Sequence, residues 1–134
     1  MSSHDNPEDR IAIVGTLPPP FGGVTVHIRR KLQMLADAKI PYRIYEQTGK
    51  SSDDKTIVPA KNGAKNFLKL MCSLPENLVH FHTNRLEALV IGTLILRLRR
   101  KTYVITVHSE APERAIQSKN FLMRMIYNLS LIHI

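Results

Sequence analysis

The sequence predicts an α/β fold, a Rossmann-like parallel sheet with helices on both of its faces. Short apolar runs rich in branched residues recur at Ile11 to Val14, Leu78 to Phe81 and Tyr103 to Val107, and each is long enough for a buried strand. Segments with apolar residues at helical spacing separate these runs. Such alternation favours parallel strands joined by right-handed crossovers, and ligands are then expected at the carboxyl ends of the strands.

The first strand leads into a loop that suits the close approach of an anion. Gly15 to Gly23 contains three consecutive prolines and ends in the pair Gly22-Gly23. A helix start offers backbone N–H groups to an anion, and glycine has no Cβ to hold a phosphate away. A tight turn without a ligand explains the same two glycines equally well. The helix itself is predicted from apolar residues at helical spacing: Val24, Ile28, Leu32 and Leu35.

Two familiar phosphate-binding motifs are excluded. The loop reads GTLPPPFGG, whereas the dinucleotide fingerprint requires G-x-G-x-x-G. Gly49-Lys50-Ser51 has the tail of a P-loop, but Ile44 occupies the position at which that motif requires glycine. We therefore interpret this tripeptide as part of a solvated loop over residues 47–56.

The middle of the chain supplies two further extended segments and a second helix. Tyr42 to Tyr45 is expected to form a strand, and Ile57 to Pro59 a brief extended piece. Ala60 to Leu74 has helical periodicity. Three lysines of that segment fall on one face, which predicts either a solvated edge or a contact with an anionic membrane surface: Lys61, Lys65 and Lys69.

Polar residues follow the strands of the second half. His82-Thr83-Asn84-Arg85 comes directly after Phe81, and Asn84 is a candidate cap for a helix from Leu86 to Leu98, with Glu87 in the capping-box position. That helix is apolar on nearly all sides, which predicts burial between the sheet and its neighbours. His108-Ser109-Glu110 ends the last strand, and a final helix is expected from Pro112.

Length and composition indicate one domain with an anionic partner. The chain has 134 residues and a net charge of +8, which suits nucleic acid, an anionic membrane face or phosphorylated substrates. Residues 1–9 are expected to be a disordered tail, unlike a secretory signal. Cys72 is the only cysteine, so no internal disulfide forms. The expected location is cytoplasmic, with peripheral attachment at the inner face of a membrane as a further expectation.

The histidines suggest a metal site, but the surrounding residues do not support one. His80 and His82 are two residues apart in a predicted strand, so their side chains share one face. Zinc requires three or four converging ligands, and no cysteine or carboxylate pattern adds the rest to these two and His108. We expect packed, hydrogen-bonded histidines and no metal. No Ser-His-Asp order, Cys-His pair or paired-carboxylate motif supports a hydrolase.

Two segments resemble a known enzyme group. GTLPPPFGGVTVHIRRK and VITVH, residues 104–108, are similar to the first strand–loop–helix and to a later strand of GT-B-fold glycosyltransferases of the retaining group 1 type, within the amino-terminal domain. The resemblance implies that Gly22 and Gly23 lie against the diphosphate of the sugar donor. It implies that His108, as catalytic residue, contacts the transferred sugar or the acceptor region. His82, Arg85 and Glu110 are candidates for the acceptor or sugar side.

The same resemblance implies what such a domain needs from elsewhere. The substrates would be a nucleoside diphosphate sugar and an unknown acceptor, with no further cofactor. Residues 10–134 would be an incomplete acceptor-side domain of a GT-B enzyme, a fragment without turnover of its own. A second domain with an E-x7-E motif would hold the nucleotide, and it is missing from this chain.

A non-catalytic α/β module that binds nucleic acid or another polyanion is the alternative. Its basic patches would be Arg29-Arg30-Lys31 and the segment from Arg97 to Lys101. Aromatic residues are not interleaved with these cations, which counts against nucleic acid. A nicotinamide-dependent oxidoreductase is disfavoured because the dinucleotide fingerprint is absent.

Overall fold

The computed structural model describes residues 6–17, 22–61, 63–83 and 85–107, and these form one five-stranded parallel sheet. The strand order is β3-β2-β1-β4-β5, and every neighbouring pair is parallel. This architecture confirms the predicted fold class. The strands are β1 (Ile11–Gly15), β2 (Tyr42–Glu46), β3 (Ile57–Pro59), β4 (Leu78–Thr83) and β5 (Thr102–Val107).

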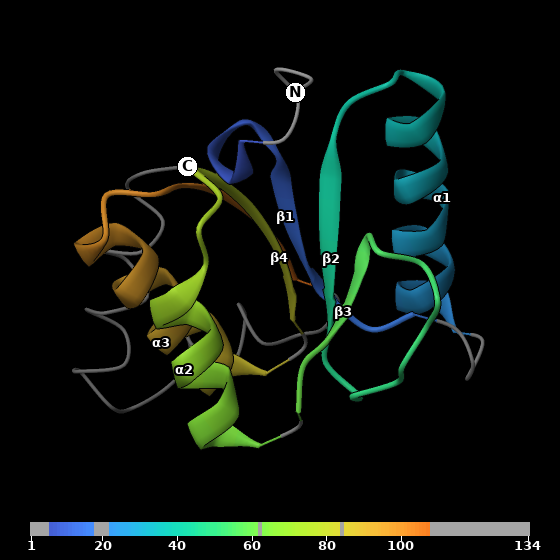
Figure 1. Cartoon of the computed structure of the whole chain (residues 1–134). Helices are drawn as coiled ribbons and strands as arrows, with labels where there is room; N and C mark the ends of the chain where they lie inside the picture. The colour runs from blue at the N-terminus through green and yellow to red at the C-terminus, as the bar shows by residue number, and fades with distance from the viewer. Residues whose placement is uncertain (1–5, 18–21, 62, 84, 108–134) are drawn as a thin grey trace.

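Helices cover both faces of the sheet, as predicted. Helix α1 (Gly23–Asp37) lies on one face, whereas α2 (Ala64–Ser73) and α3 (Leu86–Leu98) lie together on the other (Figure 1). The described residues contain no helix that is long and apolar enough to cross a membrane.

The larger core lies between the sheet and the α2–α3 pair. Phe81 and Val14 point from the central strands into a buried cluster that includes Met71 of α2 and Leu96 of α3. Gly92 lets α3 approach this cluster closely, because a Cβ there would lie 2.9 Å from Cε1 of Phe81. The packing fixes α3, and with it the start of α3 at the sheet edge.

The α1 face has a smaller apolar core. Ile13 of β1, Ile28 of α1 and Ile44 of β2 are fully buried against one another. Gly15 ends β1 at the point of closest approach, where a Cβ would lie 2.6 Å from Cδ1 of Ile28. Because Gly15 has no side chain, α1 can pack closely against the end of β1.

The topology brings the carboxyl ends of the strands and the starts of the helices to one edge of the sheet. From β1, the chain turns through α1 to β2 on one side, whereas β4 pairs with β1 on the other side. The reversal of direction between β1 and β4 is the place where open α/β sheets bind ligands. All three helices follow strands, so their amino-terminal ends lie at this carboxyl edge, at the lower side of Figure 1.

The second helix begins later than predicted. Helix α2 starts at Ala64 rather than Ala60, because Gly63 has a φ of 111° and cannot belong to a right-handed helix. Lys61 therefore lies outside the helix, and the expected row of three lysines on one helical face was wrong. Lys65 and Lys69 are on α2 and exposed.

The third helix is less buried than its composition predicts. Ile91, Leu94 and Leu98 are 40%, 50% and 74% exposed, although Leu89 and Leu96 are buried. Among the described residues, the sheet and α2 cover one side of α3, so the predicted burial between the sheet and its neighbours is found for only part of the helix. Its N-cap residue is Arg85, without a capping side-chain bond; the predicted cap Asn84 lies outside the described residues.

The end of β4 and the amino terminus also differ from the predictions. Strand β4 extends to Thr83 because His82 and Thr83 pair with Thr106 and Val107 of β5. At the amino terminus Pro7–Asp9 form a short 3-10 helix where a disordered tail is predicted; Asn6 accepts a hydrogen bond from the N–H of Glu8 there. His108 and Glu110 lie outside the described residues.

Candidate functional site

A cavity of about 400 Å³ opens at the carboxyl edge of the sheet. It lies where β1 and β4 diverge, so the predicted ligand edge of the fold is hollowed. The starts of all three helices contribute to its wall. Residues from four strand ends and these helix starts line it: Gly15, Thr16, Thr25, Gln47, Thr48, Ala60, Lys61, Gly63, Ala64, Phe67, Leu68, Leu70, His82, Thr83, Arg85, Glu87, Ala88 and Ile91.

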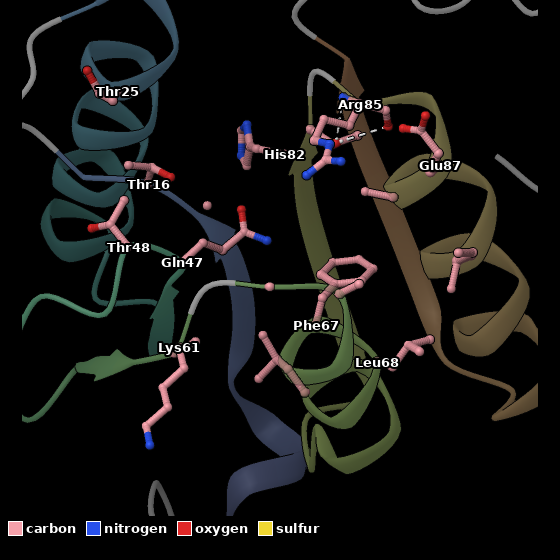
Figure 2. Close-up of a pocket in the computed structure, with 18 residues that line it drawn as sticks. Thr16, Thr25, Gln47, Thr48, Lys61, Phe67, Leu68, His82, Arg85 and Glu87 are labelled. Carbon is pink, nitrogen blue, oxygen red and sulfur yellow. Dashed lines mark hydrogen bonds between the residues drawn. The ribbon is translucent and has the colours of Figure 1, made fainter.

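The cavity has a polar end and an apolar end. Figure 2 shows Thr16 and Thr25 on the α1 side, His82 and Arg85 on the β4 side, and Gln47 between them. Apolar side chains of α2 and α3 complete the wall, among them Phe67, Leu68, Leu70 and Ile91. The cavity can therefore contact a ligand that is polar at one end and apolar at the other.

Gly22 and Gly23 lie at the start of α1, as predicted, beside the cavity rather than in its lining. Gly22 is the N-cap residue, and its N–H donates to Oγ1 of Thr25 at 3.0 Å, while that hydroxyl lies 3.1 Å from the carbonyl oxygen of Gly22. Thr25 itself lines the cavity. The first turn of α1 thus joins the glycine pair to the cavity wall.

Neither glycine is required by the packing or the backbone of the described residues. A Cβ at Gly22 or Gly23 would meet no described atom within 4 Å, and neither residue has a positive φ. The contrast with Gly15, where a Cβ would collide with Ile28, is direct. Open space at two successive glycines leaves the backbone of the helix start accessible to a ligand.

The helix starts at this edge are poor in capping side chains. Gly22, Gly63 and Arg85 are the N-cap residues of the three described helices, and none of them makes a side-chain cap bond. The first N–H groups of a helix have no intrahelical acceptor. The edge therefore carries partial positive charge from three helix dipoles, in addition to the guanidinium of Arg85.

His82 is buried at the inner wall of the cavity. Its side chain is 2% exposed, its ring stacks on His80 at a centroid distance of 4.3 Å, and the ring of His27 lies 5.9 Å away. The prediction that His80 and His82 share one face and pack together is confirmed. His27 is exposed on α1, and its ring faces that of His82.

His80 continues the histidine row away from the cavity. The ammonium of Lys31 lies 2.8 Å from Nδ1, and Nε2 lies 2.8 Å from Oγ1 of Thr106 on β5. Nζ of Lys31 also lies 3.3 Å from Nε2, so the ring of His80 lies between Lys31 of α1 and Thr106 of β5. Partial burial lowers the pKa of Lys31. The row fixes the ring of His80, on which His82 stacks.

Glu46, at the end of β2, lies outside the cavity lining but holds Thr48 of that lining in place, a role that the sequence did not reveal. It is 1% exposed, and its carboxylate accepts hydrogen bonds from the hydroxyl of Thr48 at 2.7 Å and from the N–H groups of Lys50 at 3.0 Å and Leu17 at 3.3 Å. These bonds tie the loop after β1 to the loop after β2. The available signal was an acidic residue that directly ends an apolar strand.

Arg85 links the end of β4 to the start of α3. Its N–H donates to Oγ1 of Thr83 at 3.0 Å, which fixes the backbone where strand passes into helix. The side chain is exposed at the mouth of the cavity, and the carboxylate of Glu87 lies on the same helix turn (Figure 2). Of the predicted acceptor or sugar residues, His82 and Arg85 are therefore brought together.

The basic patches of the alternative interpretation are partly engaged within the molecule. Nη1 of Arg99 donates to the carbonyl oxygen of Met71 at 3.0 Å, and Nζ of Lys101 donates to that of Pro75 at 3.2 Å. Lys31, in the other patch, contacts His80. In the part of the chain that the structure describes, no group of three metal-ligating side chains converges.

Comparison with known proteins gives no relative. The chain matches no protein-family model, no curated protein and no solved structure. Function is therefore inferred from the residues and their geometry.

Proposed function

We propose that this chain is the acceptor-side domain of a glycosyltransferase that moves a sugar from a nucleoside diphosphate donor to an acceptor hydroxyl. The observation that carries the proposal is the cavity at the divergence of β1 and β4, with the accessible glycine pair beside it. The resemblance of the two sequence segments to group 1 glycosyltransferases supports the same assignment. The proposed enzyme would also need a second domain that binds the nucleotide.

The donor diphosphate would lie at the start of α1. During transfer the acceptor oxygen bonds to the anomeric carbon while the bond from that carbon to the diphosphate oxygen breaks, and the hydroxyl proton is released. Negative charge then builds on the departing diphosphate. Backbone N–H groups at Gly23 and at the next residue of the first turn are directed at such a charge, and the helix dipole adds to them.

The sugar or acceptor would lie in the cavity beside β4. His82 and Arg85 line that part of it, and the stacked His80 together with Lys31 holds the ring of His82 in place. His108, the proposed catalytic residue, and Glu110 follow β5, whose carboxyl end lies at the same edge because β5 is parallel to β4. Their roles come from the resemblance alone.

Peripheral attachment to an anionic membrane from the cytoplasmic side remains part of the proposal. Lys65 and Lys69 are exposed on α2, and the chain carries a net charge of +8. Each cation near an anionic surface contributes about 1 kcal/mol, so a few are enough for reversible binding. Polyanion binding through the two basic patches has less support, because three of their cations already bond within the molecule.

A glycine-selective NMR titration tests the donor contact. The chain has six glycines, so ¹⁵N-glycine labelling gives a spectrum that is simple to assign. Pyrophosphate and a nucleoside diphosphate should shift the amides of Gly22 and Gly23, whereas Gly92, inside α3, should stay in place. Unmoved signals from the glycine pair, or shifts confined to the two basic patches, would contradict the proposal.

A paired substitution separates binding from folding. Gly23→Val should abolish the pyrophosphate-induced shift of Gly22, because a branched side chain would occupy the space in front of the helix start. Ala36→Val, at an exposed position later in α1, is the matched control for the helix propensity of valine. The two variants should melt at similar temperatures, since no described atom lies within 4 Å of a Cβ at Gly23.

A further inference from the structure

We infer that the acceptor is a single amphiphilic molecule, with an anionic headgroup in the polar end of the cavity and a hydrocarbon chain that continues from the apolar end along the exposed face of α3. The inference rests on the proposed function for its identification as an acceptor. The binding of an amphiphile is inferred from the structure alone, because a polar end of the cavity is followed by an apolar end and then by an exposed apolar strip on α3.

The polar end of the cavity suits a small anion. Arg85 presents a guanidinium at its mouth, and the starts of all three helices direct partial positive charge toward it. Gln47 and Thr16 offer further hydrogen-bonding groups (Figure 2). Glu87 is the one acidic side chain in the lining, and it lies on the same helix turn as Arg85, where it can orient the guanidinium.

The other end of the cavity is apolar and leads outward. Phe67 and Leu68 of α2 and Ile91 of α3 line it, and Leu68 and Ile91 are each 40% exposed. Leu94 and Leu98 follow Ile91 at spacings of three and seven residues, so all three share one face of α3. The apolar wall of the cavity therefore continues as an exposed strip along the helix.

The exposed strip is not explained by the core. Leu89 and Leu96 already anchor α3 to the sheet, and Ile91, Leu94 and Leu98 lie outside that contact. A continuous apolar strip that begins inside a cavity with a cationic mouth matches an extended chain attached to an anionic group. A flat bilayer would contact the strip but would leave the cavity empty.

The test uses decyl phosphate, below its critical micelle concentration, as the probe. The single Cys72 is exposed on α2, one turn after Leu68, and carries an environment-sensitive fluorophore without further engineering. Decyl phosphate should produce a saturable blue shift. Decyl glucoside, which has the same chain and a neutral headgroup, should bind about tenfold more weakly. Inorganic phosphate should leave the emission unchanged.

Four single substitutions assign the two ends of the ligand. Arg85→Gln should raise the Kd for decyl phosphate about tenfold and leave that for decyl glucoside unchanged. Ile91→Gln and Leu94→Gln should raise both values at least about fivefold. Met34→Gln is the matched control: Met34 is 70% exposed on α1, on the opposite face of the sheet, and its replacement should change neither value.

The outcomes separate this inference from the proposed function. No saturable shift, equal affinity for the two amphiphiles, or binding only to vesicles of anionic lipid would overturn the inference. If pyrophosphate still moves Gly22 and Gly23 in that case, the glycosyltransferase proposal stands without it. If decyl phosphate binds as expected while the glycine signals do not move, the cavity is an amphiphile site and the donor contact is wrong.

Discussion

The two edges of the sheet are built in opposite ways. At the amino edge, where helices end and strands begin, polar groups bond to one another. Arg99 donates to the carbonyl oxygen of Met71 in α2, and Lys101 donates to that of Pro75 in the loop before β4. Glu76 of the same loop accepts from Tyr45. At the carboxyl edge the N-cap residues of the three described helices make no side-chain cap bond, and the helices begin around an open cavity. One edge uses its polar groups for the fold, and the other is the edge at which we propose that a ligand binds.

The contrast teaches which residues report on stability and which on binding. Substitutions at the amino edge should lower the free energy of unfolding and leave the titrations with pyrophosphate and decyl phosphate unchanged. Substitutions at Gly22, Gly23 or Arg85 should weaken the response in these titrations and leave the free energy of unfolding nearly unchanged. Glu46 is the exception at the carboxyl edge, because its carboxylate holds the loops after β1 and β2 together.

The largest expected effect is at Tyr45. Its hydroxyl lies 3.0 Å from each carboxylate oxygen of Glu76, which is fully buried. Tyr45→Phe leaves that carboxyl group without this donor and should lower the free energy of unfolding by about 2–3 kcal/mol. Tyr42→Phe, at a half-buried position of the same strand, is the control and should change it by less than about 1 kcal/mol. Urea unfolding of both variants measures the difference; equal values would show that the pair contributes nothing.

The same pair predicts a loss of stability at alkaline pH. Burial, followed by the charge and the hydrogen bond of Glu76, raises the pKa of Tyr45 to about 12. The folded protein keeps this proton while the unfolded chain releases it near pH 10, so the stabilisation is complete below about pH 10 and is lost toward about pH 12. In this window the wild type should lose up to about 1.4 kcal/mol per pH unit more than Tyr45→Phe.

Lys31 acts in the opposite direction and serves as an internal check. Burial lowers its pKa, so the folded protein releases that proton before the unfolded chain does, and stability rises with pH up to the ordinary lysine value of 10.5. Both proteins contain Lys31, so its contribution cancels in the difference. Parallel curves for the two proteins above pH 10 would contradict the assignment to Tyr45.

The fold could be predicted from the sequence because its signals are local and repeated. Apolar runs such as Tyr103 to Val107 identify buried strands, and the helix start at Gly23 follows from the glycines and the spacing after them. Boundaries were less predictable where one residue decides them. The φ of Gly63 delays α2, and pairing with β5 extends β4 to Thr83, neither of which periodicity reveals.

The site could be predicted only where topology places a residue. His82 and Arg85 follow a strand, so the edge at which they lie was predictable. The bonds of Glu46 join segments that are distant in the sequence, and the contact of Lys31 with His80 depends on how α1 crosses the sheet. The exposed face of α3 was missed because composition shows that a helix is apolar without showing how much of it the sheet covers.

A smaller effect on stability is expected at Arg99. The polyanion-binding alternative assigns this side chain to a basic patch, whereas in the structure it bonds within the fold. Its bond to the carbonyl oxygen of Met71 joins the end of α3 to α2. Arg99→Met keeps most of the apolar stem and should lower the free energy of unfolding by about 1–2 kcal/mol. Lys65→Met, on the exposed side of α2, should change it by at most about 0.5 kcal/mol. A loss of heparin affinity without a loss of stability would instead favour the polyanion interpretation.

The smallest predicted effect, a gain, concerns the helix ends of the amino edge. Lys39 and Arg100 have φ values of 55° and 56°, immediately after the C-cap residues of α1 and α3. In each case the next N–H reaches back into the helix, from Ile40 to the carbonyl oxygen of Leu35 and from Lys101 to that of Leu96. Closing the helix this way requires the left-handed region, which a side chain disfavours.

Replacing either residue with glycine should therefore stabilise the protein. The relief of left-handed strain exceeds the added entropy of the unfolded chain, so Lys39→Gly and Arg100→Gly should each raise the free energy of unfolding by about 0.5–1 kcal/mol. Ala38→Gly is the control: Ala38 has a φ of −79°, so glycine there relieves nothing and should lower the same quantity by about 0.5–1 kcal/mol. Neither gain should alter the pyrophosphate-induced shifts of Gly22 and Gly23, because the change lies at the opposite edge of the sheet. A gain in stability accompanied by weaker shifts would mean that the two edges are coupled, and that the division between a structural edge and a binding edge is wrong.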